Sequence, residues 1–240
     1  LRSDVRSVVH NATLNVLDQL GTSRWLDSYQ VFRLVSLQAV CLYYLDYVPS
    51  IEDLQKISTH VDRHASGLFL FDLNNQDKEK FELAMASRRQ LDQLIWPALN
   101  SPFAEHLASD LNLSVDQILD QLVTILFAGV DTMSACLAFS MWSLSSEQPE
   151  RAEIKKAIKS SLLNAPPAYF LPRGATEDVD IFGLKISRGW NINVMISELH
   201  RAHERGSSKG MYCPFGLGKK KCPGQAFSLV AMHEIICALY

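Results

Sequence analysis

The sequence has little of several features that define special classes of protein. Glycine (11) and proline (9) are sparse among the 240 residues, which excludes collagen-like and low-complexity chains. Five cysteines are too few for a disulfide scaffold. The net charge is only −3, so no overall positive field draws nucleic acid, and none is expected as a partner. Hydrophobic residues make up 48%, which is enough for a buried core at this length.

A targeting signal is also missing from the residues given. The chain starts at Leu1 without a methionine or an apolar signal region, so no signal or anchor is expected in it and the localisation stays open. One internal run, 122–144, is long enough to span a bilayer, and Asp131 is its sole charged residue. No cluster of Lys or Arg flanks this run. A helix buried on all sides in a core is the preferred interpretation, and a membrane span is the alternative.

The pattern of apolar residues changes along the chain. Residues 1–110 are predicted to be a region of helices, with breaks at 66–67 and 74–75. One of these helices is expected to be buried on two sides, because apolar residues load two of its faces. These residues are Phe32, Val35, Ala39 and Leu42 on one face, and Leu34, Leu37, Cys41 and Tyr44 on the other. Residues 111–240 contain all the chemistry described below, and the two regions are expected to form one domain.

A long helix is predicted in the second region. Ser114 and Gln117 form a capping box before an apolar run that continues to Leu144. Such a helix would be roughly 45 Å long at about 1.5 Å per residue. Gly129 lies in its middle, where glycine costs about 1 kcal/mol relative to alanine, so a bend or a closely approaching ligand is expected there.

The apolar period changes to two after Pro166 and Pro167, which predicts a small β-sheet before a last helix. The fold class is therefore mainly α with a small β-sheet. The alternating residues are Val179, Ile181, Leu184 and Ile186 around Gly183, then Trp190, Ile192, Val194 and Ile196. The expected buried face of the last helix consists of Leu229, Met232, Ile236 and Leu239.

A cysteine stands at the start of this last helix, in the segment Phe215-Gly-Leu-Gly-Lys-Lys-Lys-Cys-Pro-Gly224. The backbone N–H groups and the helix dipole stabilise a thiolate there, and three lysines add to that effect. Gly224 leaves a bare backbone against which a flat group fits. A thiolate in this setting suits an axial ligand of iron. Two alternatives stay open: a buried or reactive cysteine, and a zinc site of Cys213, Cys222, His233 and Cys237.

This segment resembles the haem-binding signature of the cytochrome P450 family. The resemblance implies that Cys222 ligates haem iron, that Phe215 packs near its sulfur and that Gly218 forms the turn. Lys220 stands where the family usually has arginine, and as a point charge it would pair with a haem propionate. The lysines 219–221 would attract an acidic electron donor, although a solvated turn is the alternative.

A second match lies in the predicted long helix, where Ala128-Gly-Val-Asp-Thr132 resembles the oxygen-activating motif of the same family. The resemblance implies that Gly129 loosens the helix to make room for dioxygen, and that Asp131 and Thr132 deliver protons. A polar patch facing solvent is the alternative for the Asp-Thr pair.

A third match runs from Pro166 to Arg173 and resembles the segment that passes the haem edge. Arg173 would hold a propionate, and Ala168 and Phe170 would line an apolar substrate pocket together with Phe127 and Ala128. His200 is expected to be a structural hydrogen-bonding residue rather than a ligand.

Besides Lys220, two further departures from the family are found. The Glu-x-x-Arg pair that precedes the double proline is replaced by Ser160 and Leu163, and the segment before the cysteine loop is reduced to 205–210. The resemblance implies a cytochrome P450-type fold that is incomplete, and a haem-thiolate monooxygenase. This enzyme would use dioxygen, an apolar substrate and an electron-donating reductase or ferredoxin. A non-catalytic haem- or ligand-binding remnant of the family is the alternative.

Overall fold

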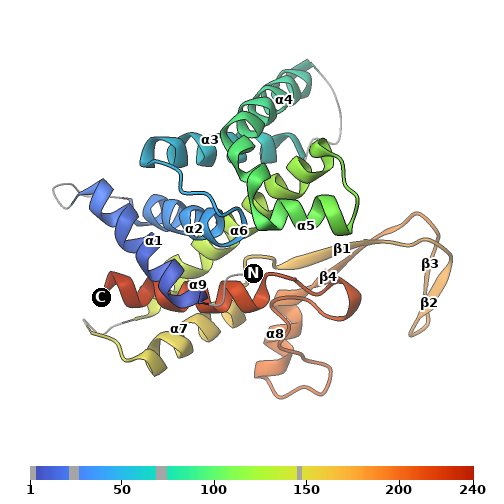
Figure 1. Ribbon diagram of the computed structural model, residues 1–240. Coiled ribbons are helices and arrows are strands. Elements are labelled where there is room, and N and C mark those ends of the chain that lie inside the picture. The colour runs from blue at the N-terminus through green and yellow to red at the C-terminus, as the bar shows by residue number, and fades with distance from the viewer. Residues whose placement is uncertain (1–3, 22–26, 69–74, 145–147) are drawn as a thin grey trace.

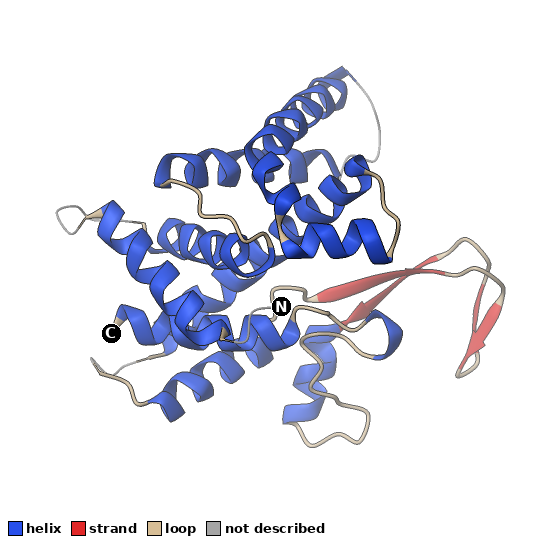
Figure 2. Cartoon of the chain, viewed as in Figure 1, coloured by secondary structure: helices blue, strands red, loops and turns tan. Residues whose placement is uncertain are grey.

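Helices dominate the structure, a computed structural model that describes residues 4–21, 27–68, 75–144 and 148–240 (Figures 1 and 2). The α-helices are α1 (Val5–Leu20), α2 (Ser28–Tyr44), α3 (Ile51–Leu68), α4 (Asn75–Ile95), α5 (Pro102–Asp110), α6 (Val115–Ser143), α7 (Arg151–Asn164), α8 (Ile196–Glu204) and α9 (Gln225–Leu239). Two short 3-10 helices are η1 (Trp96–Asn100) and η2 (Gly218–Lys220). The strands are β1 (Phe170–Gly174), β2 (Val179–Ile181), β3 (Leu184–Ile186) and β4 (Asn191–Met195).

The long helix α6 forms as the sequence predicts. Its capping box is complete, because the Ser114 N–H donates to Gln117 Oε1 at 2.9 Å and the Gln117 N–H donates to Ser114 Oγ at 3.4 Å. The helix continues for 29 residues, and Leu144 caps its end. It packs against α2, α7 and α9, so it lies at the centre of the helical body (Figure 1).

Helix α2 is buried along its whole middle, which confirms the expectation of a helix covered on two sides. Every residue from Val31 to Cys41 is buried, including the charged Arg33. The core that surrounds α2 combines side chains of α1, α2, α3, α6, α7 and α9. Among the largest fully buried side chains are Leu37, Leu54, Leu122, Leu126, Leu137, Ile154 and Met232. Each such side chain contributes about 1.5–3 kcal/mol through removal of apolar surface from water.

Helix α6 is also, among the residues described, the helix that is long and apolar enough to cross a membrane. Its most apolar window is 44% buried within the protein. Helix α6 packs against α2, α7 and α9 as a core helix does, but Ala128 and Thr132 are exposed. The expectation that it is buried on all sides is therefore wrong for one of its faces.

The β structure is two separate pairs of strands, not one sheet. Strand β1 pairs antiparallel with β4, and β2 pairs antiparallel with β3. Phe182 and Gly183 both have positive φ and make the tight turn between β2 and β3. The β2–β3 hairpin extends away from the helical body (Figure 1). The predicted alternation of apolar and polar residues therefore forms strands, but these strands have no well-buried face. Ile196, which was expected to continue the last strand, begins α8 instead.

The predicted helix break at 66–67 is slightly misplaced, because α3 continues to Leu68. Gly67 stays helical, and a Cβ there would lie 2.4 Å from Cβ of Ala84 on α4. This glycine therefore serves the close approach of two helices. Of the second predicted break, Asn74 lies outside the described residues and Asn75 begins α4.

Candidate functional site

The loop before α9 is closed by its own backbone. The Cys222 N–H donates to the Phe215 carbonyl at 2.9 Å, and the Gly216 N–H donates to the Cys213 carbonyl at 3.0 Å. Gly216 and Gly218 have φ values of 68° and 66°, a conformation that glycine adopts without strain. Phe215 is partly buried against the core, so it anchors the loop. The glycine spacing that the sequence shows is therefore the spacing that this closed loop needs.

Cys222 differs from the other cysteines in its surroundings. It is exposed, whereas Cys41, Cys136 and Cys213 are buried and Cys237 is partly buried. Burial raises the pKa of Cys41 to about 12, and it raises the pKa of Cys213 as well. Helix α9 begins three residues after Cys222, so the free N–H groups of its first turn lie close by. Cys222 is thus the accessible one of the five thiols, and it lies close to a helix N-terminus.

The bare backbone at Gly224 borders the sulfur. A Cβ at this position would lie 3.8 Å from Cys222 Sγ, so a larger side chain would stand beside the sulfur. Strand β1 approaches the same loop, because Leu171 Cδ1 would lie 3.4 Å from a Cβ at Gly216. This contact places β1, which follows the double proline, next to the cysteine loop.

His200 ties this loop to two helices. It is fully buried on α8, its Nδ1 lies 2.9 Å from the Leu163 carbonyl of α7, and its Nε2 lies 3.0 Å from the Cys213 N–H. The ring therefore carries its proton on Nδ1, donates to Leu163 and accepts from Cys213. This confirms that His200 is a structural hydrogen-bonding residue. It also links the position of the missing family arginine, Leu163, to the start of the cysteine loop.

Replacing His200 by glutamine should lower the free energy of unfolding by about 1–2 kcal/mol, because one amide does not reach both partners in the same geometry. Urea unfolding measures this change, and the reactivity of the Cys213 thiol with a thiol reagent should rise. His203→Gln is the matched control, since His203 is exposed on the same helix. Equal stability and equal Cys213 reactivity in the two variants would contradict this role.

The face of α6 that carries Ala128 and Thr132 is open. Both residues are exposed, whereas Val130 and Met133 on the opposite side are buried. The Thr132 hydroxyl donates to the Ala128 carbonyl at 2.7 Å, which leaves its oxygen free to accept a hydrogen bond. Phe127 is partly buried and packs against the core. Thr132 and Ala128 are therefore accessible from solvent, whereas Phe127 is only partly accessible.

Gly129 faces helix α2 and not an open space. A Cβ on Gly129 would lie 3.0 Å from Cγ2 of Val40. The helix is unbroken at this position, which differs from the loosened helix that the sequence suggests. The close approach is therefore made by a neighbouring helix, and the absent side chain lets α2 and α6 touch.

Gly129→Val should destabilise the protein by about 1–3 kcal/mol, because the added side chain overpacks the contact with α2. Shortening the neighbour, as Val40→Ala in the same chain, should recover part of the loss. Thermal unfolding of the single and double variants measures both effects. Gly174→Val is the control, since nothing lies within 4 Å of a Cβ there. If Val40→Ala brings no recovery, the packing explanation is wrong.

Asp131 is held in a partly buried charge network. Its carboxylate pairs with the Arg33 guanidinium of α2, which also pairs with Asp62 of α3. The Arg33 Nε and Nη2 atoms donate to Ser58 Oγ at 3.3 and 3.2 Å. Burial raises the pKa of Asp131 although Arg33 opposes this, so its carboxyl takes up a proton more readily than an exposed aspartate. The polar pair Asp131–Thr132 is thus divided, with Asp131 turned to Arg33 and Thr132 exposed.

The remaining predicted residues are exposed or partly buried. Arg173 is exposed on β1 and its guanidinium donates to the Pro172 carbonyl at 2.7 Å. Lys220 is exposed on η2 and Ala168 is exposed before β1. Phe170 is partly buried and makes an edge contact with Tyr169 at 4.8 Å between ring centroids. These contacts do not involve Cys222, so the haem and substrate roles of the four residues stay predictions.

The alternative zinc site of four residues is not assembled. His233 and Cys237 lie together with Glu234. The Cys213 thiol instead donates a weak hydrogen bond to the Met211 carbonyl, and Cys222 is exposed in the loop before α9. The ligand set foreseen from the sequence is therefore wrong, although two of its members meet.

Sequence reasoning missed Arg33 and an aromatic group beside the cysteine loop. The rings of Tyr43 and Phe227 stack at 4.6 Å, and Tyr44 contacts both Phe227 and Phe103. Burial raises the pKa of Tyr44 to about 12, and the nearby Tyr43 and Cys222 add to this effect. A lone arginine inside the apolar run 31–41 was the available signal for Arg33. No spacing in the sequence indicates the aromatic group, because its members come from α2, α5 and α9.

Comparisons with known proteins agree with this geometry. Cytokinin hydroxylase from Arabidopsis thaliana is 24% identical over 229 residues, which cover 78% of this chain and 43% of that protein. Cytochrome P450 3A5 from Homo sapiens is 27% identical over 204 residues, which cover 67% of this chain and 40% of that protein. The chain thus spans less than half the length of these curated relatives. No protein-family profile matches it.

Solved structures with the same fold include a six-coordinated cytochrome P450 from Thermus thermophilus. Its TM-score is 0.75 at 19% identity, covering 99% of this chain and 68% of that one. P450BioI, solved with an acyl carrier protein ligated to hexadec-9Z-enoic acid, gives a TM-score of 0.76 at 16% identity, covering 98% and 66%. The chain is thus similar in sequence to cytochrome P450s and has part of their fold.

Proposed function

We propose that this chain forms the thiolate side of a haem site in a cytochrome P450-type monooxygenase. The observation that carries the proposal is the closed loop that holds Cys222, the exposed one of the five cysteines, at the start of α9. The described residues fit a haem on this side, because an exposed thiol, a bare Gly224 and a helix N-terminus adjoin one another. When bound, a haem supplies the activation of dioxygen, and a thiolate ligand favours cleavage of its O–O bond.

The other residues have the following proposed roles. Thr132 offers its hydroxyl oxygen on the open face of α6, and Asp131 exchanges protons with water at the edge of its charge network. Phe127, Ala128, Ala168 and Phe170 offer apolar surface to an organic substrate. Arg173 and Lys220 are exposed and positively charged, so they suit the haem propionates. The lysines 219–221 suit an acidic electron donor, a reductase or ferredoxin.

The departures from the family favour a second candidate, a remnant that no longer catalyses oxygenation. Ser160 and Leu163 replace the charged pair, and the Asn164 amide donates to Ser160 Oγ at 3.2 Å. An uncharged contact therefore stands where the family has an ion pair on α7. Charge-assisted hydrogen bonds are worth about 1.5–3 kcal/mol each, so their loss weakens the support of a cofactor.

Titration of haem into the purified chain tests the proposal. One equivalent of haem, with the red-shifted Soret band of a thiolate ligand in the reduced CO complex, is the expected result if the site is intact. Haem binding without that band supports the remnant. No saturable haem binding at all would show that the residues near Cys222 do not form a haem site in this chain.

A further inference from the structure

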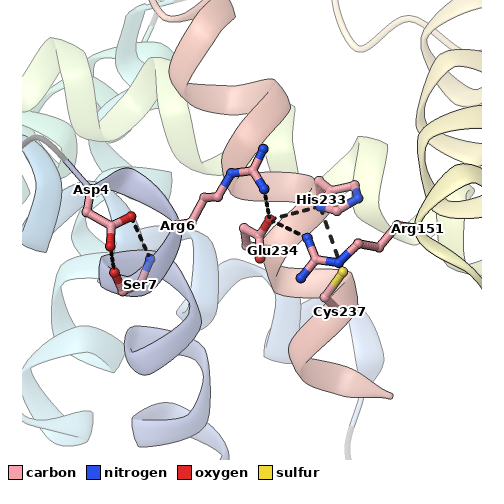
Figure 3. A network of polar contacts seen from close by, with 7 residues as sticks. All are labelled: Asp4, Arg6, Ser7, Arg151, His233, Glu234 and Cys237. Carbon is pink, nitrogen blue, oxygen red and sulfur yellow. Dashed lines mark hydrogen bonds and ion pairs between the residues drawn. The ribbon is translucent and has the colours of Figure 1, made fainter.

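Three side chains with metal-binding atoms meet on α9, away from the cysteine loop. His233 Nδ1 lies 3.0 Å from Glu234 Oε1 and 3.7 Å from Cys237 Sγ, and the three donor atoms lie within 4.8 Å of one another. Figure 3 shows the carboxylate and the sulfur each turned toward the imidazole, with the guanidinium of Arg151 beside them. His233 and Cys237 are one helical turn apart, so they share a face of α9.

The distances suit a small divalent ion. Tetrahedral Zn²⁺ bonds nitrogen, oxygen and sulfur at about 2.0–2.3 Å, which separates its ligands by roughly 3.4–3.7 Å. The observed separations of 3.0 and 3.7 Å from His233 Nδ1 lie close to this range. The third separation, between the Glu234 carboxylate and Cys237 Sγ, is at most 4.8 Å. Rotation of these two side chains by about 1 Å therefore brings imidazole, carboxylate and thiolate into ligand positions.

Two of the three side chains are shielded from bulk water. His233 and Glu234 are only 6% and 4% exposed, and His233 Nε2 is buried without a hydrogen-bond partner. Glu234 is compensated by His233, Arg151 and Arg6, and His233 Nδ1 is partnered by Glu234.

We propose that His233, Glu234 and Cys237 form a Zn²⁺ site with one coordination position left for water. Binding releases the thiol proton of Cys237 to solvent, and the imidazole binds through Nδ1 with its proton on Nε2. The ligand set of one imidazole, one carboxylate and one thiolate is the borderline-soft set that zinc prefers. The carboxylate and the thiolate together balance the charge of the ion. The site does not depend on haem.

Two arginines compete with the ion for the same carboxylate. Arg151 Nη1 lies 3.3 Å and Arg6 Nη1 lies 3.8 Å from Glu234 Oε1 (Figure 3). Their side chains are 61% and 64% exposed, so both reach water without a large rearrangement. Ion pairs of this kind are weak, and the metal displaces them. Zinc and the arginines therefore exclude each other at Glu234.

Titration with Co²⁺, a spectroscopic substitute for Zn²⁺, tests the site. The experiment uses the Cys222→Ser chain, because the exposed Cys222 thiol binds metals by itself. One equivalent of Co²⁺ should produce thiolate-to-cobalt charge-transfer absorption, and added Zn²⁺ should remove it. Cys237→Ser should abolish this absorption and lower the affinity by more than about tenfold, the least that loss of an outer metal partner costs. Cys213→Ser, another cysteine outside the cluster, should leave both unchanged.

A second variant tests the competition. Arg151→Gln should tighten Co²⁺ binding by roughly fivefold, since an exposed ion pair is worth up to about 1 kcal/mol. Lys78→Gln on α4 removes the same charge from an exposed position and should have no effect. The proposal is overturned if charge-transfer absorption is absent, if it survives Cys237→Ser, or if Arg151→Gln does not raise the affinity above that of Lys78→Gln.

Discussion

Replacing Cys222 by serine should abolish every thiolate-type feature of the haem spectrum. A serine hydroxyl stays protonated at neutral pH, so it cannot donate charge to iron as a thiolate does. The loop should keep its shape, because the Cys222 N–H bond to the Phe215 carbonyl uses the backbone alone. The reduced CO complex measures the effect, and in Cys222→Ser its red-shifted Soret band should be missing.

The other four cysteines provide the controls for this prediction. Cys41→Ser, Cys136→Ser, Cys213→Ser and Cys237→Ser should each keep the thiolate spectrum, since these thiols are buried or partly buried. Cys213→Ser is the most informative, because Cys213 begins the same loop and its carbonyl accepts from Gly216. If Cys213→Ser removes the band while Cys222→Ser retains it, the ligand assignment is reversed.

The sequence predicts those parts of the fold that depend on interactions between residues close together in the chain. The capping box at Ser114, the glycine turn before Cys222 and the two strands on either side of Gly183 depend on a few neighbouring residues, and all three are present. Features formed by distant segments were not predictable in this way. Within its own helix, the glycine at position 129 suggests that a ligand approaches closely. In the structure the group that approaches Gly129 is the side chain of Val40 on α2.

The charge network at Asp131 shows the same division between local and distant information. An aspartate next to a threonine in an apolar helix indicates a functional polar pair, and the sequence offers no partner for it. The partner is Arg33, 98 residues away, and the network includes Ser58 and Asp62 of a third helix. One buried guanidinium thus joins α2, α3 and α6, and this arrangement depends on packing that no local pattern encodes.

Replacing Arg33 by leucine should therefore be the most destabilising charge removal in the helical body. Arg33 is 4% exposed, and its loss leaves two carboxylates without their cation. Removal of one partner from a buried pair costs about 3–5 kcal/mol. The carboxylates of Asp131 and Asp62 are 37% and 53% exposed, so water compensates them in part. We expect a loss of about 2–3 kcal/mol, measured by urea unfolding at an unchanged slope.

A second substitution separates the charge effect from the loss of packing. Asp131→Asn in the Arg33→Leu chain removes the less exposed of the two unpaired carboxylates, so it should restore about 1 kcal/mol. Arg88→Leu on α4 is the matched control, because Arg88 also pairs with two aspartates, Asp92 and Asp120. The Arg88 side chain is 18% exposed, so it is more accessible to water than that of Arg33. Its cost should stay at about 1 kcal/mol, as for pairs in contact with water. Should Arg33→Leu cost no more than Arg88→Leu, or should Asp131→Asn restore nothing, the three helices are held together by apolar contacts and Arg33 does not organise them.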